Sequence, residues 1–209
     1  MVQTAGVEGV GLRERKKTET RRAIAASALN LALVRGPDDI TVDDIANAAN
    51  VSPRTVFNYF GSRYEAILGI DPEWRAELVA ELLARPAIEP PLEALAAVLK
   101  AALTNVGDAG RLWRDRARLV AQYPHLRAAQ AASQAAIEAD LARAVASRTG
   151  LRDDHPYCVL VVAAGLVVSR GVLARSGSFN DATMRRHLDE GIAALARGLT
   201  PPPVAASRR

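Results

Sequence analysis

The chain has 209 residues, a formal net charge of +4 and an isoelectric point near 9.6, and this length allows a buried core in one domain or in two. Aromatic residues make up only 4%, and no alternating Val/Ile/Thr segments lie between hairpin turns, so the composition favours an all-α fold over a sheet. A single cysteine, Cys158, excludes an intramolecular disulfide, and the longest apolar run, Tyr157 to Val168, is well short of the roughly 18 residues that a membrane span needs. With no segment that resembles a signal peptide, these features predict a cytoplasmic protein without a membrane partner.

The first predicted helix runs from about Arg13 to Arg35 and stops at Gly36-Pro37, after a lead-in of residues 1–11 that shows no periodicity and is expected to be disordered. Helical spacing predicts that Ile24, Ala28, Leu29 and Leu31 are buried. A basic run is most often a solvated terminus, but at the start of this helix it can also meet DNA phosphates. The basic residues of the run are Arg13, Arg15, Lys16, Lys17, Arg21 and Arg22.

Two short helices follow, and each begins with a recognisable cap. Thr41 and Asp44 form the pattern of a capping box that opens a helix ending at Asn50, a residue that tolerates the left-handed backbone of a sharp turn. Ser52-Pro53 opens a second helix that reaches about Phe60, because serine caps and proline suits the first helical position. These spacings predict a helix-turn-helix.

A fourth helix is predicted from the sequence Ser62-Arg63-Tyr64-Glu65, which reads as a full capping box. Downstream, Pro- and Gly-containing segments punctuate about five or six further helices. The helix-turn-helix and the helices beside it are thus expected over residues 12–70, and the remaining helices over residues 71–200.

The second short helix carries side chains suited to DNA. Arg54 can make a bidentate contact with guanine and Asn58 with adenine, whereas Tyr59 and Arg63 are placed to contact phosphate. Each residue taken alone is more often a solvated surface side chain, and only their joint spacing favours recognition of DNA. The predicted DNA-binding residues are Lys16, Lys17, Thr41, Ser52, Pro53, Arg54, Thr55, Asn58, Tyr59 and Arg63.

The segment ITVDDIANAANVSPRTVFNYFGSRYEAIL resembles the N-terminal domain of TetR-family repressors, and the resemblance covers roughly residues 16–70. The chain departs from the family pattern at Ala32, which stands where an aromatic residue is common, at Asn50, which replaces a turn glycine, and at Arg63, which replaces a lysine. The resemblance implies a homodimeric, ligand-responsive repressor that binds a palindromic operator in double-stranded DNA. It further implies a three-helix helix-turn-helix DNA-binding domain over residues 12–70 and a larger helical domain over residues 71–200, which holds the effector and dimerises through its last two helices.

The small residues of the helix predicted over 156–174 agree with such an interface, and we expect a partner helix to approach closely at Gly165. The alternative is a central helix of a monomeric core. No motif marks an effector site, and no cofactor is expected. The candidates for lining a site for a small apolar or acyl effector, each also explicable as ordinary core, are Trp74, Leu99, Leu103, Trp113, Val120 and Tyr123.

An enzyme is the main alternative function. The three histidines, His125, His155 and His187, show no metal-binding spacing, and the sequence contains no G-x-S-x-G, Walker or G-x-G-x-x-G motif. Cys158 lies in the most apolar segment, where a buried thiol is expected rather than a nucleophile. A structural interaction protein is the third possibility, and the outward-facing Arg54, Asn58, Tyr59 and Arg63 argue against it.

Overall fold

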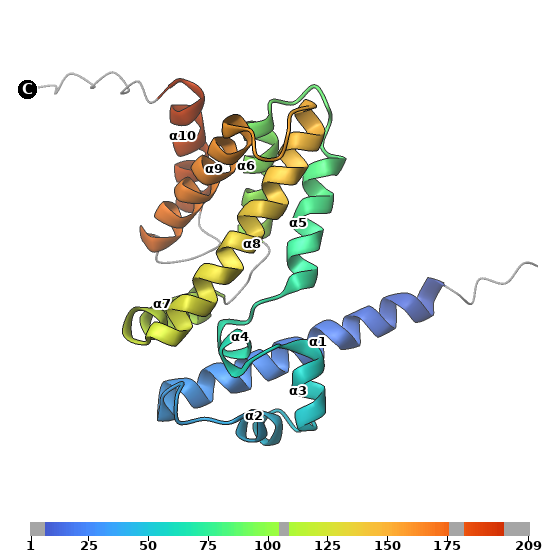
Figure 1. Cartoon of the computed structure of the whole chain (residues 1–209), viewed down its shortest axis with the longest axis vertical. Coiled ribbons are helices and arrows are strands. Elements are labelled where there is room, and N and C mark those ends of the chain that lie inside the picture. The colour runs from blue at the N-terminus through green and yellow to red at the C-terminus, as the bar shows by residue number, and fades with distance from the viewer. Residues whose placement is uncertain (1–6, 105–108, 176–181, 199–209) are drawn as a thin grey trace, which may run out of the picture. The chain divides into compact units, whose positions relative to one another are not determined.

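The computed structural model describes residues 7–104, 109–175 and 182–198. These residues form helices joined by turns and contain no strand, which confirms the all-α prediction (Figure 1). The helices are α1 (Val7–Arg35), α2 (Val42–Ala48), α3 (Pro53–Tyr59), α4 (Arg63–Leu68), α5 (Pro72–Ala84), α6 (Pro91–Thr104), α7 (Ala109–Gln122), α8 (Pro124–Thr149), α9 (Pro156–Arg175) and α10 (Ala182–Ala196).

Helix α1 begins at Val7, earlier than the predicted Arg13, so the expectation of disorder is wrong for residues 7–11, and residues 1–6 lie outside the described residues. Its end at Arg35 is as predicted. The following Gly36 has a φ of +92°, a conformation that glycine adopts without a steric penalty, and its amide donates to the carbonyl of Ala32. The chain therefore leaves the helix at the Gly-Pro pair, as the sequence indicates.

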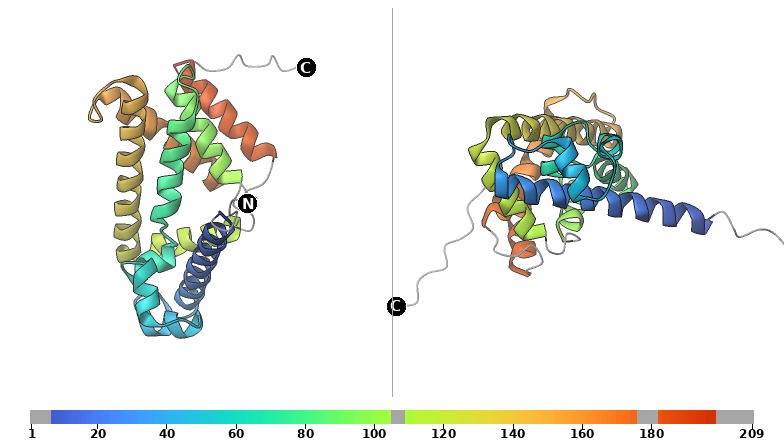
Figure 2. Two further views of the ribbon diagram at one scale, coloured as in Figure 1. Left: turned by 90° about the vertical axis from the view of Figure 1, so that its right-hand side faces the viewer. Right: turned by 90° about the horizontal axis from the view of Figure 1, so that it is seen from below.

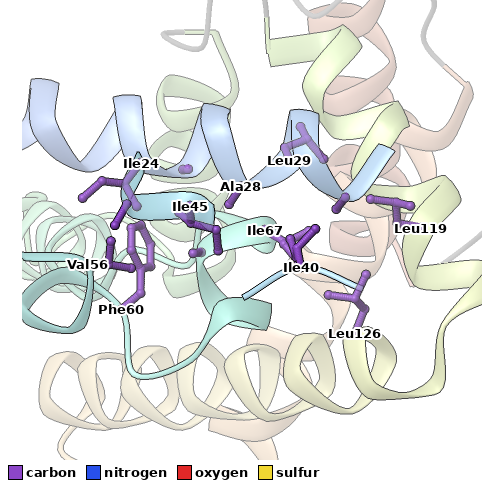
Figure 3. Packing of buried hydrophobic residues seen from close by; sticks show 14 residues of the cluster. Ile24, Ala28, Leu29, Ile40, Ile45, Val56, Phe60, Ile67, Leu119 and Leu126 are labelled. Carbon is purple, nitrogen blue, oxygen red and sulfur yellow. The ribbon is translucent and has the colours of Figure 1, made fainter. Parts of the chain in front are cut away.

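Contacts divide the chain into two compact units. The first comprises residues 1–71 and 112–134, and so contains α1 to α4 together with most of α7 and the start of α8. Its core includes Ile24, Ala28 and Leu29 from α1, as predicted, and Leu119 and Leu126 from the later helices (Figure 3). Residues 112–134 thus pack with the helix-turn-helix, although they lie far from it in the sequence.

The second unit comprises residues 72–111 and 135–209. Its core gathers buried side chains of α5, α6, the later part of α8 and α9, including Leu82, Leu95 and Leu141. The thiol of Cys158 is buried in this core, as expected, and donates to the carbonyl of Arg152 over 3.6 Å. Helices α6, α9 and α10 lie beside one another, and Figure 2 shows α10 alongside α6.

Candidate nucleic-acid interface

Each short helix of the helix-turn-helix begins at the predicted cap. The Thr41 hydroxyl accepts from the Asp44 amide over 3.1 Å, and the Asp44 carboxylate accepts from the Thr41 amide over 2.8 Å, so the capping box is complete. The Thr41 hydroxyl also donates to the Asp44 carboxylate over 2.7 Å, and this bond, followed by the one from the Thr41 amide, lowers the pKa of Asp44 from 3.8 to about 2. At α3 the Ser52 hydroxyl accepts from the Thr55 amide over 3.1 Å, and Pro53 takes the first helical position.

The turn between α2 and α3 has the predicted geometry. Asn50 has a φ of +53°, and the Val51 amide donates to the Ala46 carbonyl over 2.9 Å, which closes the turn. Ala46, Val56 and Phe60 are buried where the two helices meet, and Val51 packs against them. The small side chain of Ala46 lets the two helices approach closely, so α3 is fixed by its packing against α2.

The outer face of α3 leaves Arg54 and Asn58 exposed, and Thr55 and Tyr59 half-buried. The same face carries Phe57, whose side chain is 58% exposed, and which the sequence reasoning left out. A signal existed, because Phe57 lies one position past Val56 and therefore off the buried stripe of Val56 and Phe60. An exposed phenyl ring on a recognition helix can contact a thymine methyl group.

The side chain of Arg63, at the first position of α4, contacts Tyr64 and Asp38 of the same chain. Its Nη2 donates to the Tyr64 hydroxyl over 2.8 Å, its guanidinium lies 4.8 Å from the centre of the Tyr64 ring, and Nη2 is 3.8 Å from an Asp38 carboxylate oxygen. The Tyr64 hydroxyl in turn donates to Asp38 over 2.9 Å. To contact a phosphate, the Arg63 guanidinium therefore has to leave Tyr64 and Asp38 or bind the phosphate while it keeps these contacts.

The basic start of α1 divides into two kinds of side chain. Arg15, Lys16 and Arg22 are exposed and Lys17 is half-buried, as a phosphate-facing surface requires. Arg21 differs, because it is buried and its Nη1 donates to the Tyr59 carbonyl over 3.0 Å. Arg21, which is not among the predicted DNA-binding residues, therefore faces the protein interior and not the solvent.

The six effector candidates are divided between the two units. Leu99 is buried in the core of the second unit, Leu103 is half-buried and Trp74 is 41% exposed, whereas Val120 and Tyr123 pack against the core of the first unit. Trp113 also belongs to the first unit and is half-buried. Within the described residues, a cavity of about 290 Å³ lies along α8 and α9 instead, lined by Glu138, Ala139, Ala142, Arg143, Asp153, Asp154, Val159, Val162 and Ala163.

Helix α9 presents an apolar stripe to solvent, which we define as Leu160, Ala164, Val167 and Gly171. These residues follow a spacing of three or four along the helix, with Leu160 66% and Val167 60% exposed. Gly165 does not belong to this stripe. A Cβ atom placed there would lie 2.9 Å from Leu95 Cδ2 of α6, so the expectation that a partner helix approaches at Gly165 is wrong, and the glycine accommodates the chain's own α6.

The described part of the chain contains no group of three or more His, Cys, Asp or Glu side chains placed to hold a metal ion. None of its helices is both long enough and apolar enough to cross a bilayer.

Comparison with known proteins identifies both halves of the chain. Residues 24–67 match the model of the tetR family of bacterial regulatory proteins, and residues 89–200 match the MftR C-terminal domain. The chain is 38% identical over 173 residues to the HTH-type transcriptional regulator TcmR of Streptomyces glaucescens, covering 78% of this chain and 76% of TcmR. It is 30% identical over 157 residues to MftR of Mycobacterium tuberculosis, covering 74% and 79% of the two chains.

Among solved structures, Thermus thermophilus FadR, a TetR-family transcriptional repressor in complex with lauroyl-CoA, has a similar fold. The TM-score is 0.54 at 21% identity, over 90% of this chain and 100% of FadR. The fold, the capped helix-turn-helix and the extent of these matches lead to one conclusion: the chain belongs to the TetR family and is a DNA-binding transcriptional regulator, not an enzyme.

Proposed function

We propose that the protein is a repressor that binds a near-palindromic operator as a homodimer, with one α3 in each of two successive major grooves. The observation that carries this proposal is the face of α3, where Arg54, Phe57 and Asn58 are exposed on a helix fixed by the Ser52 cap and by buried Val56. A two-fold dimer requires half-sites about one helical turn apart. The protein acts in the cytoplasm, where bacterial DNA is accessible.

Each exposed side chain of α3 is suited to a different group on the DNA. Arg54 is suited to guanine O6 and N7, Asn58 to adenine N6 and N7, and the Phe57 ring to a thymine methyl group. Tyr59 and the exposed Arg15 and Lys16 are suited to phosphate, which adds affinity without selecting sequence. Operator choice is therefore assigned to α3, and salt dependence mainly to α1.

Dimerisation is assigned to the α9 stripe together with α10. The stripe is apolar, with Leu160, Val167 and Gly171 exposed and Ala164 half-buried in the single chain. It has no long side chain at Ala164 or Gly171, and a Cβ on Gly171 would meet nothing within 4 Å. A second copy related by a two-fold axis would bring the same stripe against itself. This arrangement would remove the exposed Leu160 and Val167 from water.

An effector of apolar or acyl character is the natural regulator of such a protein. FadR, which has the same fold, is complexed with lauroyl-CoA, and this supports an acyl ligand for the present chain without identifying one. The candidate residues Trp74, Leu99 and Leu103 lie on α5 and α6, and Trp113, Val120 and Tyr123 on or beside α7. A thermal-shift screen of acyl-CoA thioesters and free fatty acids tests this part, and release or tightening of bound DNA by a hit gives its regulatory sign.

The experiment that tests DNA binding begins with selection of duplexes from a random library by the wild-type dimer. A recovered motif with two-fold symmetry is the expected result. Affinity for that motif and for a scrambled duplex is then measured for wild type, Arg54→Ala and Lys16→Ala. Arg54→Ala should cost roughly 1–3 kcal/mol on the motif alone, and Lys16→Ala should weaken both duplexes alike. Failure of the folded wild-type dimer to enrich any motif would refute the proposed function.

A further inference from the structure

Arg21 of α1 occupies an unusual position for a residue in a basic run. It is only 8% exposed, and its Nη1 donates both to the Tyr59 carbonyl, over 3.0 Å, and to the Ile70 carbonyl, over 3.4 Å. Tyr59 is the last residue of α3, and Ile70 lies between α4 and α5. One side chain thus joins the end of the recognition helix to a segment eleven residues further along the chain.

Arg21 makes further contacts with both segments, the end of α3 and the residues between α4 and α5. Its guanidinium lies 5.2 Å from the centre of the Phe60 ring and 5.4 Å from that of Tyr59, and its Nε is 3.3 Å from an Asp71 carboxylate oxygen. We name residues 69–71 the α4–α5 joint. Arg21 therefore holds the last turn of α3 through a carbonyl and two aromatic rings, and the joint through a carbonyl and a carboxylate.

A second arginine reaches the same joint from α7. The Nε of Arg116 donates to the Ile67 carbonyl over 3.0 Å, at the C-terminal end of α4. Gly69 has a φ of +63°, and a Cβ there would lie 2.5 Å from Arg116 Nη2, so the glycine is required both by the backbone and by the guanidinium. The position of the joint is therefore tied to α7 as well as to α3.

We propose that Arg21 is a positioning residue for operator recognition, through which the geometry of the α4–α5 joint sets the position of the C-terminal end of α3. The planar guanidinium suits this task, because it donates in fixed directions and can hold two carbonyls at once, whereas a lysine ammonium is a mobile point charge. Its charge also suits the C-terminal end of a helix, where carbonyl dipoles gather. The proposal rests on the proposed DNA-binding function and adds a residue that contacts no DNA itself.

Arg22 provides a matched control, because it is the next residue of the same helix, carries the same charge and is exposed. The test compares Arg21→Met, Arg21→Lys, Arg22→Met and wild type. Affinity is measured for the duplex that wild type selects from a random library and for its scrambled counterpart. Hydrogen exchange is followed for peptides covering residues 53–60 and 67–71, with and without the selected duplex.

Hydrogen exchange of the peptide covering residues 67–71, which includes the α4–α5 joint, is the decisive measurement. In wild type, selected DNA should slow exchange at residues 67–71, because coupling between two sites is reciprocal. Arg21→Met should lose about tenfold in affinity for the selected duplex, with little change on the scrambled one, and should lose the DNA-dependent protection of the joint. Arg22→Met should weaken both duplexes equally and retain that protection. Arg21→Lys should behave like Arg21→Met, since it keeps the charge and not the planar fork.

The outcomes separate the two proposals. A wild-type dimer that selects no DNA would overturn both. Normal selection combined with an unchanged joint response in Arg21→Met, or full rescue by Arg21→Lys, would overturn the positioning role alone. If Arg21→Met does not fold, Asp71→Asn gives the test, because it removes the charge on the joint side and leaves the Arg21 contact with Tyr59. Asp71→Asn should lose the protection of the joint from hydrogen exchange when the selected duplex binds. Unchanged protection would overturn the positioning role of Arg21.

Discussion

Replacing Leu160 and Val167 by glutamate should dissociate the dimer without unfolding the protomer. About two thirds of each side chain is exposed in the single chain, with values of 66% and 60%. Full burial of a leucine or valine is worth about 1.5–3 kcal/mol, so covering the exposed part gives about 1–2 kcal/mol for each. In a two-fold interface each residue counts twice, and the pair supplies about 4–8 kcal/mol. The double variant should therefore raise the dimer dissociation constant by at least about a thousandfold.

Sedimentation equilibrium over a range of concentrations measures this constant, and circular dichroism confirms that the variant is folded. Leu83→Glu is the control, because Leu83 is an exposed leucine of α5 and does not belong to the α9 stripe. Gly165→Arg is unsuitable, since a side chain there would collide with Leu95 inside the protomer. A folded double variant that dimerises as tightly as wild type would refute the assignment of the interface to the stripe.

Three further predictions concern other parts of the chain. Phe57→Ala should reduce affinity for the selected duplex by about 1 kcal/mol or more and relax the base preference at one position, measured by repeating the selection; an unchanged motif would contradict it. Because the folded pKa of Asp44 lies near 2, below its ordinary 3.8, its contribution to stability is present above 3.8 and disappears as the pH falls through about 2. Denaturant unfolding should therefore show Asp44→Asn less stable than wild type at neutral pH and equally stable below about pH 2, and a difference in stability that persists below about pH 2 would count against the capping box. Gly191→Ala should lower the free energy of unfolding by about 1–2 kcal/mol, because its Cβ would lie 2.7 Å from the stiff Val168 side chain; a Tm at or above wild type would show that α10 can shift.

The local features of the DNA-binding helices could be predicted because their signals span three or four residues. The Thr41 and Ser52 caps and the left-handed Asn50 are all present as expected. The Ser62 box is only partly as predicted, since Ser62 accepts from the Glu65 amide while the Glu65 carboxylate accepts from Gly61. The flexible Glu65 side chain can reach either the Ser62 amide or the neighbouring Gly61 amide, and the sequence does not indicate which of the two it binds.

Contacts between distant segments could not be predicted in the same way. The Arg63 guanidinium is held by Asp38, which precedes it by 25 positions, and Val120 packs on a core formed mostly by α1 to α4. Which helix pairs with which depends on the summed burial of many side chains, and a single sequence gives no direct measure of it. The ligand candidates were chosen by residue type alone, and residue type does not distinguish a pocket wall from a core.

Arg21 lies between these two cases, because a local signal for its burial existed. It precedes Ile24 by three positions and Ala28 by seven, which is the spacing of one helical face, and both of those residues are fully buried. Arg22 is turned by about 100° from that face and is exposed. Treating the basic run as one surface overlooks this difference in phase. A charged residue in phase with a buried stripe has to find partners inside the protein, and in this chain those partners are the end of the recognition helix and the α4–α5 joint.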